Sequence, residues 1–429
     1  MKLLKFTMFV TCTTIVFGIS APNAVAETPE TLYSFCSQQN CTDGAYPVGG
    51  VTRGNDGALY GTTAEGGANN DGVVFALFPA GNSYTFNVVY NFCGQANCAD
   101  GSLPVDAPIV DQNGNLFGVT PSGGVHQSGI VYELKPNPNR SAYTFIDLYD
   151  FCSQKSCSDG IDPVSTLTYA GADAGVPYDG LSPLYGATQQ GGILNSGLVF
   201  QLTLINGQTQ RQLSVVHSFC GRQNCPDGIA PNGVIADSAA NLYGTTRSGG
   251  KESNGTLFQL NSADSYSETV LYNFCKHPDC SDGSKPAAPP ARDKKGALFG
   301  TVASGGRGWG ALYKTKPSGG AKILHSFCDA PTGCPSGREG ENPNAGVVVG
   351  PHGNVYGTVQ YGGANGGGGT IYEFGRSGFR VIYSFCSQLC DDGDTPGPVI
   401  LGPKSTLFGT TQVNGGHDGG NVFRVKIQN

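Results

Sequence analysis

One phrase recurs seven times along the chain and sets the number and size of its structural units. Its first copy, Leu32 to Gly44, reads LYSFCSQQNCTDG: a short apolar run, two cysteines and an Asp-Gly turn. The copies follow one another about every 57 residues, and periods of this size are typical of repeat arrays and propellers. We therefore treat the chain as seven equivalent units.

Each unit contains the signals for four short strands. After the cysteine phrase come a proline and an apolar run such as 107–110, a segment of the LYGTT type (Leu59–Thr63), a Gly-Gly loop, a third run (Gly72–Leu77) and a fourth (Tyr84–Phe92). These runs are rich in β-branched and aromatic residues and are separated by turn residues. Four antiparallel strands repeated seven times predict an all-β fold, a seven-bladed β-propeller.

The two ends of the chain predict how the ring closes. The mature chain begins with a fourth strand (Thr31–Phe35) and ends with a third strand (Asn421–Ile427). Pairing of the N-terminal strand with the C-terminal blade completes that blade and leaves no open sheet edge. An open solenoid is the alternative, but it needs atypical capping repeats, which we do not find in the sequence.

The N-terminus has the features of an export signal, which we assign to residues 1–26. Lys2 and Lys5 precede an apolar stretch, and Ala24 and Ala26 fit a small-x-small cleavage site. An uncleaved anchor is the alternative, but the stretch is shorter than the roughly 20 residues that span a bilayer. Residues 27–429 then form a single propeller domain, secreted to the periplasm or the exterior and not inserted in the membrane.

The charge of the mature chain argues against polyanionic partners. The formal net charge of the whole chain is −7, and removal of Lys2 and Lys5 with the signal makes it −9. An acidic protein does not attract phosphate backbones or anionic lipids, so we expect no nucleic-acid partner.

Fourteen cysteines remain after the signal, and they fall into one local pair per unit. Because an exported chain meets an oxidising compartment, we predict disulfides; metal–thiolate sites are the alternative, but matched histidines are lacking. The predicted pairs are Cys36/Cys41, Cys93/Cys98, Cys152/Cys157, Cys220/Cys225, Cys275/Cys280, Cys328/Cys334 and Cys386/Cys390.

Three aromatic positions recur in every unit. They are the Phe before the first cysteine (Phe35 in the first copy), the aromatic residue of the LYGTT segment (Tyr60) and that of the third run (Phe75). A binding site needs aromatic residues in one place, whereas packing between blades needs them in every blade. We therefore interpret these residues as core.

The LYGTT segment, the Gly-Gly loop and the G-VF start of the third run resemble the GloVer repeat of the bacterial choice-of-anchor tandem repeat proteins. The resemblance covers essentially the whole mature chain. It implies an exported surface or extracellular repeat protein with no assigned activity, and it supplies no catalytic residues. This chain differs by its added cysteine pairs and by the absence of a visible C-terminal anchor.

The Asp of the Asp-Gly turn recurs in six units, and Ser336 takes its place in the sixth unit. A ring of carboxylates is a candidate Ca²⁺ site, because calcium prefers oxygen ligands. We favour ordinary turn chemistry, in which Asp bonds its own backbone, and so expect no cofactor, with calcium as the alternative. The candidate residues are Asp43, Asp100, Asp159, Asp227, Asp282 and Asp392.

Alternating strand direction predicts that the cysteine loops and the Gly-Gly loops lie on one face of the propeller. Function concentrates on loops held by a rigid scaffold, so we place any site on that face. Trp309, the single tryptophan, lies in a Gly-Gly loop and is a candidate for stacking a sugar, with a partly buried loop anchor as the alternative. His217 and His325 replace the tyrosine of the fourth strand and are expected to pack.

The sequence contains no nucleophile, zinc-protease or phosphate-loop motif, and we assign no catalytic residue. We expect a non-catalytic extracellular binding or interaction scaffold, with a glycan or another cell-surface molecule as its ligand. The alternative is a metal-assisted hydrolase, lactonase or lyase with its site at the channel mouth. That alternative requires acids or histidines from individual blades to converge there.

Overall fold

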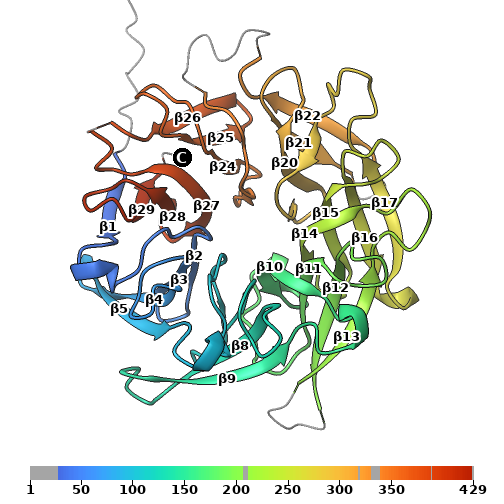
Figure 1. The fold of residues 1–429 in the computed structure, drawn as a ribbon. Helices are drawn as coiled ribbons and strands as arrows, with labels where there is room; N and C mark the ends of the chain where they lie inside the picture. The colour runs from blue at the N-terminus through green and yellow to red at the C-terminus, as the bar shows by residue number, and fades with distance from the viewer. Residues whose placement is uncertain (1–27, 206–210, 317–318, 330–338, 388, 428–429) are drawn as a thin grey trace, which may run out of the picture.

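The computed structural model describes residues 28–205, 211–316, 319–329, 339–387 and 389–427. Within these ranges, twenty-nine strands form seven antiparallel sheets arranged in a ring (Figure 1). The predicted all-β, seven-bladed propeller is therefore confirmed. The predicted signal peptide, Cys334 and Ser336 lie outside the described residues.

Each blade begins with an innermost strand beside the central axis and ends with an outer strand (Figure 1). The innermost strands are β2 (Val51–Arg53), β6 (Ile109–Val110), β10 (Ile161–Thr168), β14 (Ile229–Ala236), β18 (Ser284–Pro286) with β19 (Ala291–Arg292), β23 (Val348–Val349) and β27 (Asp394–Gly402). The second strands are β3 (Leu59–Thr63), β7 (Leu116–Thr120), β11 (Leu184–Gln190), β15 (Leu242–Ser248), β20 (Leu298–Ser304), β24 (Val355–Val359) and β28 (Thr406–Val413).

The outer half of each blade consists of its third strand and its outer strand. The third strands are β4 (Val73–Ala80), β8 (Ile130–Pro136), β12 (Leu198–Leu204), β16 (Thr256–Asn261), β21 (Ala311–Thr315), β25 (Thr370–Gly375) and β29 (Asn421–Lys426). The outer strands are β5 (Ser83–Asn91), β9 (Tyr143–Asp150), β13 (Arg211–Ser218), β17 (Ser267–Asn273), β22 (Ala321–Ser326), β26 (Gly378–Ser384) and β1 (Glu30–Ser34). We number the blades 1 to 7 in this order, from β2–β5 to β27–β29 with β1.

Helical structure in the described residues is limited to short 3₁₀ turns. Three of them lie in cysteine loops, and the others follow β10 and β16. They are η1 (Gln39–Cys41), η2 (Ala96–Cys98), η3 (Lys155–Cys157), η4 (Ala172–Ala174) and η5 (Ser262–Asp264).

The ring closes through the first strand, as the phase of the termini predicts. β1 pairs antiparallel with β29, with Thr31 opposite Phe423 and Ser34 opposite Asn421. An ion pair between Arg424 and Glu30 adds to this seam (2.7 Å). The seventh blade thus combines both ends of the chain, and its outer edge is formed by residues that precede all the other blades.

The hydrophobic core lies between neighbouring blades rather than inside one sheet. The aromatic residues of the three recurring positions are all buried, which confirms their interpretation as packing residues. The Phe at the end of each outer strand meets the third-strand aromatic of the next blade, as Phe35 meets Phe75 with ring centres 5.0 Å apart. Each such Phe anchors the start of a cysteine loop to the following blade, because large aromatic side chains bury much apolar area.

The glycine of the LYGTT segment makes room for this aromatic packing. A Cβ atom added at Gly61 would lie 2.4 Å from Cζ of Phe75, and one added at Gly244 would lie 2.4 Å from Cζ of Phe258. No side chain fits at such a distance, so the third-strand ring requires glycine on the neighbouring strand. The Leu-aromatic-Gly order of the motif follows from this contact.

Candidate functional site

The cysteine loops and the Gly-Gly loops are hydrogen-bonded to each other, so they lie on one face, as predicted. In blade 1 the N–H of Gly67 donates to the carbonyl oxygen of Cys41 (2.9 Å). Five other units repeat the bond, with distances of 2.9 to 3.0 Å: Gly124 to Cys98, Gly192 to Cys157, Gly250 to Cys225, Gly306 to Cys280 and Gly415 to Cys390. Each cysteine loop follows the outer strand of one blade and is fixed to the second and third strands of the next.

Six of the seven predicted disulfides are formed. They are Cys36–Cys41, Cys93–Cys98, Cys152–Cys157, Cys220–Cys225, Cys275–Cys280 and Cys386–Cys390. The remaining pair includes Cys334, which lies outside the described residues. Disulfides persist in oxidising compartments, so the six bonds agree with an exported chain.

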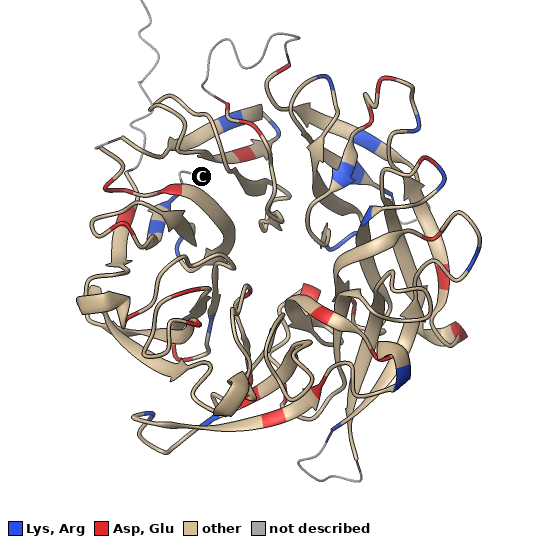
Figure 2. Ribbon diagram, viewed as in Figure 1, with Lys and Arg blue, Asp and Glu red and all other residues tan. Residues whose placement is uncertain are grey.

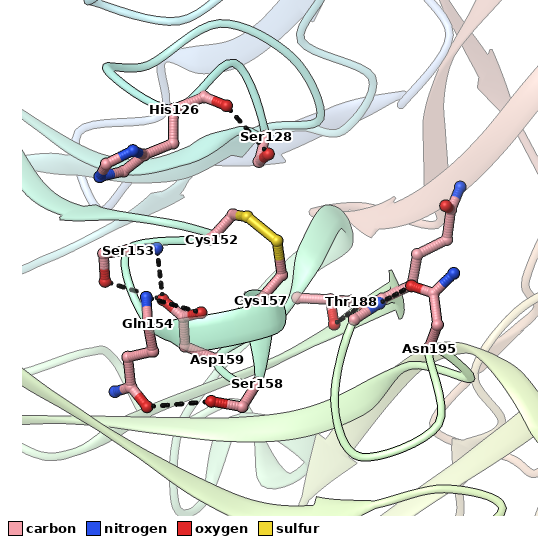
Figure 3. The surroundings of a disulfide bond; sticks show 12 residues. His126, Ser128, Cys152, Ser153, Gln154, Cys157, Ser158, Asp159, Thr188 and Asn195 are labelled. Carbon is pink, nitrogen blue, oxygen red and sulfur yellow. Dashed lines mark hydrogen bonds between the residues drawn. A yellow bond between two sulfur atoms is a disulfide. The ribbon is translucent and has the colours of Figure 1, made fainter.

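Each Asp of the Asp-Gly turn accepts hydrogen bonds from its own cysteine loop. In Figure 3, the carboxylate of Asp159 lies beside the Cys152–Cys157 bond and accepts from the backbone N–H of Ser153 (2.9 Å) and of Gln154 (3.3 Å). The hydroxyl of Tyr149, on the preceding outer strand, adds a third bond (2.8 Å). The carboxylate therefore ties the loop to the strand before it.

The same arrangement holds at Asp43, Asp100, Asp282 and Asp392, each of which accepts from the tyrosine ten or nine residues before it. At Asp227 the partner is His217, with Nε2 3.3 Å from the carboxylate. The six carboxylates thus occupy six separate loops. Among the described residues, the groups close enough to share a metal ion combine Asp71 with Cys93 and Cys98, and Asp394 with Cys386 and Cys390. Their cysteines are already disulfide-bonded.

A tyrosine or histidine near the end of each outer strand packs against the next blade. Tyr33 stacks on Phe86 with ring centres 3.7 Å apart, Tyr90 on Phe145 at 5.2 Å, and His325 on Phe379 at 3.7 Å. The residue on which this tyrosine or histidine stacks belongs to the outer strand of the next blade, where it lies opposite a fixed position of that blade's third strand. We call this position the outer-strand slot; its occupants in blades 1 to 6 are Phe86, Phe145, Leu213, Glu268, Ala321 and Phe379.

Two neighbouring blades depart from this pattern. In blade 4 the slot holds Glu268. Burial raises the pKa of this carboxyl above its usual value, although the charge of nearby His217 opposes the shift. In blade 5 it holds Ala321, the smallest occupant of the slot. The ring of Tyr272, at the end of β17, therefore lacks the aromatic cover that Tyr33 and Tyr90 have.

An open groove of about 860 Å³ results at this place. Tyr272 and Ala321 line it together with His277, Arg307, His325 and Glu339. It lies on the cysteine-loop face, along the outer strand β22 of blade 5. The groove combines an aromatic surface with a guanidinium, two imidazoles and three carboxylates, those of Asp282, Asp329 and Glu339.

The charged groups of the groove differ in how they are paired. Asp282 accepts from the Tyr272 hydroxyl (2.6 Å) and from two backbone N–H groups of its loop, so its oxygens are occupied. Burial raises the pKa of Tyr272, and the bond to Asp282 raises it further. Burial lowers the pKa of His325, although Glu339 at 3.3 Å opposes that effect. Arg307 has no salt-bridge partner among the residues that the structure describes.

Trp309 lies two residues after Arg307 in the same Gly-Gly loop. Its side chain is 54% exposed. Its backbone holds the loop in place, since its N–H donates to the carbonyl of Phe327 (2.8 Å) and its carbonyl accepts from Asn342 (3.0 Å). The indole is thus presented on the cysteine-loop face of blade 5, next to the loop residue that lines the groove.

At four blade boundaries, a threonine of the second strand joins the inner ends of neighbouring blades. Thr62 donates to the carbonyl of Asp106 in the next blade (3.1 Å), and three other threonines donate in the same way to Ala288, Ala345 and Gly397. Asp106 thus stands where other blades have small apolar residues, and burial raises its pKa to about 6. Sequence analysis missed it, although an acid between Val105 and Ala107 in the innermost apolar run was a visible signal.

The long connection of the third unit, 169–183, packs on the chain itself. Its buried Tyr178 meets the ring edge of Phe117 in blade 2 (5.3 Å), and Asp173 pairs with Arg292 of blade 5 (2.8 Å). The insertion therefore reaches from blade 2 to blade 5. No helix among the described residues is long and apolar enough to cross a membrane.

Comparison with solved structures returns proteins of low sequence identity. Sqt1 from Chaetomium thermophilum is 11% identical, with a TM-score of 0.47 over 89% of this chain and 88% of its own. A GH74 xyloglucanase from Xanthomonas campestris is 12% identical, with a TM-score of 0.48 over 85% of this chain and 50% of its own. An α-L-arabinofuranosidase from Fusarium graminearum is 9% identical, with a TM-score of 0.42 over 94% and 96%. No match was found among curated proteins.

The repeat itself is recognised at the level of a family. The model of the Gloeobacter/Verrucomicrobia repeat matches residues 23–178 and 172–338, which together make up most of the chain. These two matches include the LYGTT segments and Gly-Gly loops of blades 1 to 5. The protein therefore belongs to the family defined by the Gloeobacter/Verrucomicrobia repeat, as the GloVer resemblance of its motifs predicts.

Proposed function

We propose that this protein is an exported, non-catalytic saccharide-binding protein whose ligand occupies the groove between blades 4 and 5. The observation that carries the proposal is the break in the repeat at Ala321. The stacking partners of Tyr33, Tyr90 and His325 fill the equivalent space at three other blade boundaries. A concave site with an aromatic surface and a few polar groups is the usual form of a ligand pocket.

The arrangement of titratable groups favours binding over catalysis. The six Asp-Gly carboxylates belong to separate loops and accept hydrogen bonds within them. A hydrolase or lyase needs an acid and a base that converge on one reacting bond. Of the acids that line the groove, Asp282 accepts from the Tyr272 hydroxyl and from two backbone N–H groups, and Glu339 lies against His325 (3.3 Å). Asp106 lies at the inner end of blade 2, away from the groove.

The experiment is a glycan array probed with the mature protein, residues 27–429, followed by recovery of the bound ligand. We expect binding to a defined set of saccharides, and mass spectrometry of each recovered saccharide should show no change in mass. Recovery of a cleaved or modified saccharide would contradict the non-catalytic assignment. An array on which the folded, disulfide-bonded protein binds nothing would overturn saccharide binding.

A further inference from the structure

The chain carries its positive charge unevenly. From Lys276 to Lys322 it has nine Lys and Arg residues against three Asp and Glu residues, a net charge of +6. Since the mature chain carries −9, the remainder carries −15. Figure 2 shows Lys and Arg gathered on the side of the ring formed by blades 4 and 5. Blade 5 is thus a cationic sector in an acidic molecule, and a local field of this kind attracts anions.

A like-charge pair on the third and outer strands of blade 5 also favours an anionic ligand. Lys314 on β21 lies directly opposite Lys322 on β22. At the same place, blade 6 pairs Glu373 with Arg380 and blade 7 pairs Arg424 with Glu30. Like charges opposite each other destabilise a sheet. Two blades use this position for an ion pair, whereas blade 5 leaves two cations there without a complementary charge across the strands.

The groove lies beside this pair and adds a further cation. Lys322 separates Ala321 from Ile323 on β22, and both of these residues line the groove. Because side chains alternate along a strand, Lys322 lies on the other side of β22 from them. Arg307, on the groove itself, is held by the bond from its N–H to Ser326 Oγ (3.2 Å). A ligand that crosses the edge of β22 meets Arg307 on one side and Lys322 on the other.

We propose that the groove selects an anionic saccharide, an extended chain of sugars that carry carboxylate or sulfate groups. This inference rests on the proposed function and names its ligand class. The Tyr272 ring receives the apolar face of a sugar, and arginine pairs with carboxylate or sulfate in a bidentate manner. Ser281 and Glu339, which also line the groove, supply partners for sugar hydroxyls.

The same observations disfavour a nucleic acid. Proteins that bind single strands combine a continuous basic track with several aromatic residues that stack successive bases. Here Tyr272 is the one tyrosine that lines the groove, so successive bases lack a series of rings on which to stack. The net charge of −15 on the rest of the mature chain would repel a long polyanion that extends beyond blade 5.

The test compares a hexamer of galacturonic acid with the same hexamer fully methyl-esterified, which keeps the sugar backbone and removes the charge. Titration calorimetry gives the affinities, and the fluorescence of Trp309, the single tryptophan, reports binding near blade 5. We expect the acid to bind at least about tenfold more tightly than the ester, the equivalent of one lost charge contact. Its affinity should fall as salt concentration rises.

The variant Arg307→Ala should weaken binding of the acid about tenfold and leave binding of the ester nearly unchanged. Arg376→Ala removes an exposed cation from the turn between β25 and β26 and is the matched control, for which we expect wild-type affinity. A sulfated hexasaccharide in a parallel arm shows whether the anion is a carboxylate or a sulfate, and tighter binding of either than of the ester supports the inference.

Equal binding of acid and ester would overturn this inference and leave saccharide binding by the groove standing. Tighter binding of a twenty-residue oligothymidylate than of either acidic saccharide would overturn it in favour of a nucleic acid. Failure of every saccharide, on the array and in solution, would overturn the inference together with the proposed function.

Discussion

Two blade boundaries are built from the same repeated motifs but differ in the residues at their outer and inner ends. They are the boundary between blades 1 and 2 and the boundary between blades 4 and 5. At the outer end, Tyr90 stacks on Phe145 in the first case, whereas Tyr272 faces Ala321 in the second. At the inner end, the threonine of the second strand donates to the carbonyl of Asp106 or of Ala288. The first boundary is closed outside and has an aspartate at its inner end; the second is open outside and has an alanine at the equivalent inner position.

The difference shows how a repeat acquires a specific site. The aromatic contacts, the disulfide loops and the loop-to-loop hydrogen bonds are common to both boundaries, so they build the scaffold and do not choose a ligand. One small side chain in the outer-strand slot is enough to uncover a tyrosine and open a groove. Specific function is therefore expected where a unit departs from the repeat.

The largest effect should come from opening the closed boundary. Phe145→Ala removes the ring that stacks on Tyr90 and leaves a space like that at Ala321. Loss of a packed phenylalanine costs about 3 kcal/mol of unfolding free energy, at the lower end of the usual range because Phe145 is only partly buried. Urea denaturation measures the change. Thr144→Ala, on the exposed side of the same strand, is the control and should change stability by less than about 0.5 kcal/mol.

The inner ends should differ in their response to pH. The pKa of Asp106 in the folded protein is raised by burial to about 6, above that of the unfolded chain. The folded state therefore holds this proton more tightly, so its contribution is complete below about pH 4 and is lost as the pH rises through 6. We expect a loss of roughly 2 kcal/mol between pH 4 and pH 7 from this group.

Asp106→Ala gives blade 2 the residue that blade 5 has at this place, and its stability should lack that part of the pH dependence. Thermal unfolding of both proteins at several pH values provides the comparison. Parallel stability curves for the wild type and the variant would show that Asp106 does not titrate between pH 4 and pH 7.

Replacing the Asp of the Asp-Gly turn should lower the stability of the protein by the same amount at the two boundaries. Asp100→Asn and Asp282→Asn each place an amide where three donors converge on a carboxylate. A mismatched buried acceptor costs about 1 to 3 kcal/mol, so each variant should lose about 1.5 kcal/mol. Differential scanning calorimetry with and without calcium tests the alternative role; a calcium-dependent rise in melting temperature, lost in these variants, would argue for a metal site.

The smallest effect on stability should come from closing the open boundary. Ala321→Phe supplies the stacking partner that Tyr272 lacks, and such aromatic pairs contribute about 0.5 to 1.5 kcal/mol. We expect a gain of about 1 kcal/mol in unfolding free energy by urea denaturation. A clear loss of stability would mean that a phenylalanine at position 321 does not fit beside Tyr272 in the way that Phe145 fits beside Tyr90.

The sequence predicts most of the scaffold because its signals are repeated. The terminal strands identify the closing pair of Thr31 and Phe423, and strand alternation places Cys41 and Gly67 on one face. The recurrence of Phe35 and Phe75 indicates packing, since every blade repeats the contact. These conclusions depend on strand order and period, both of which can be read from the chain.

The groove was not predicted, although the sequence holds a signal for it. The slot lies seven residues before the first cysteine of the loop in blades 1 to 6, so counting back from the cysteine aligns Ala321 with Phe86 and Phe145. The pairing of Thr315 with Ala321, equivalent to that of Leu77 with Phe86, confirms that these residues share a slot. The contact that gives the slot its meaning joins the outer strands of two different blades, as Tyr90 and Phe145 do, and strand order and period within one unit do not reveal it.

The affinity of Ala321→Phe for the saccharide selected on the array tests the central claim most directly. A ring at position 321 fills the groove without changing any charge, and calorimetry gives the dissociation constant. Leu213→Phe, which places the same ring in the filled slot of blade 3, is the control. The account predicts at least about a tenfold loss of affinity for Ala321→Phe and none for Leu213→Phe. Wild-type affinity in a folded Ala321→Phe protein would contradict it.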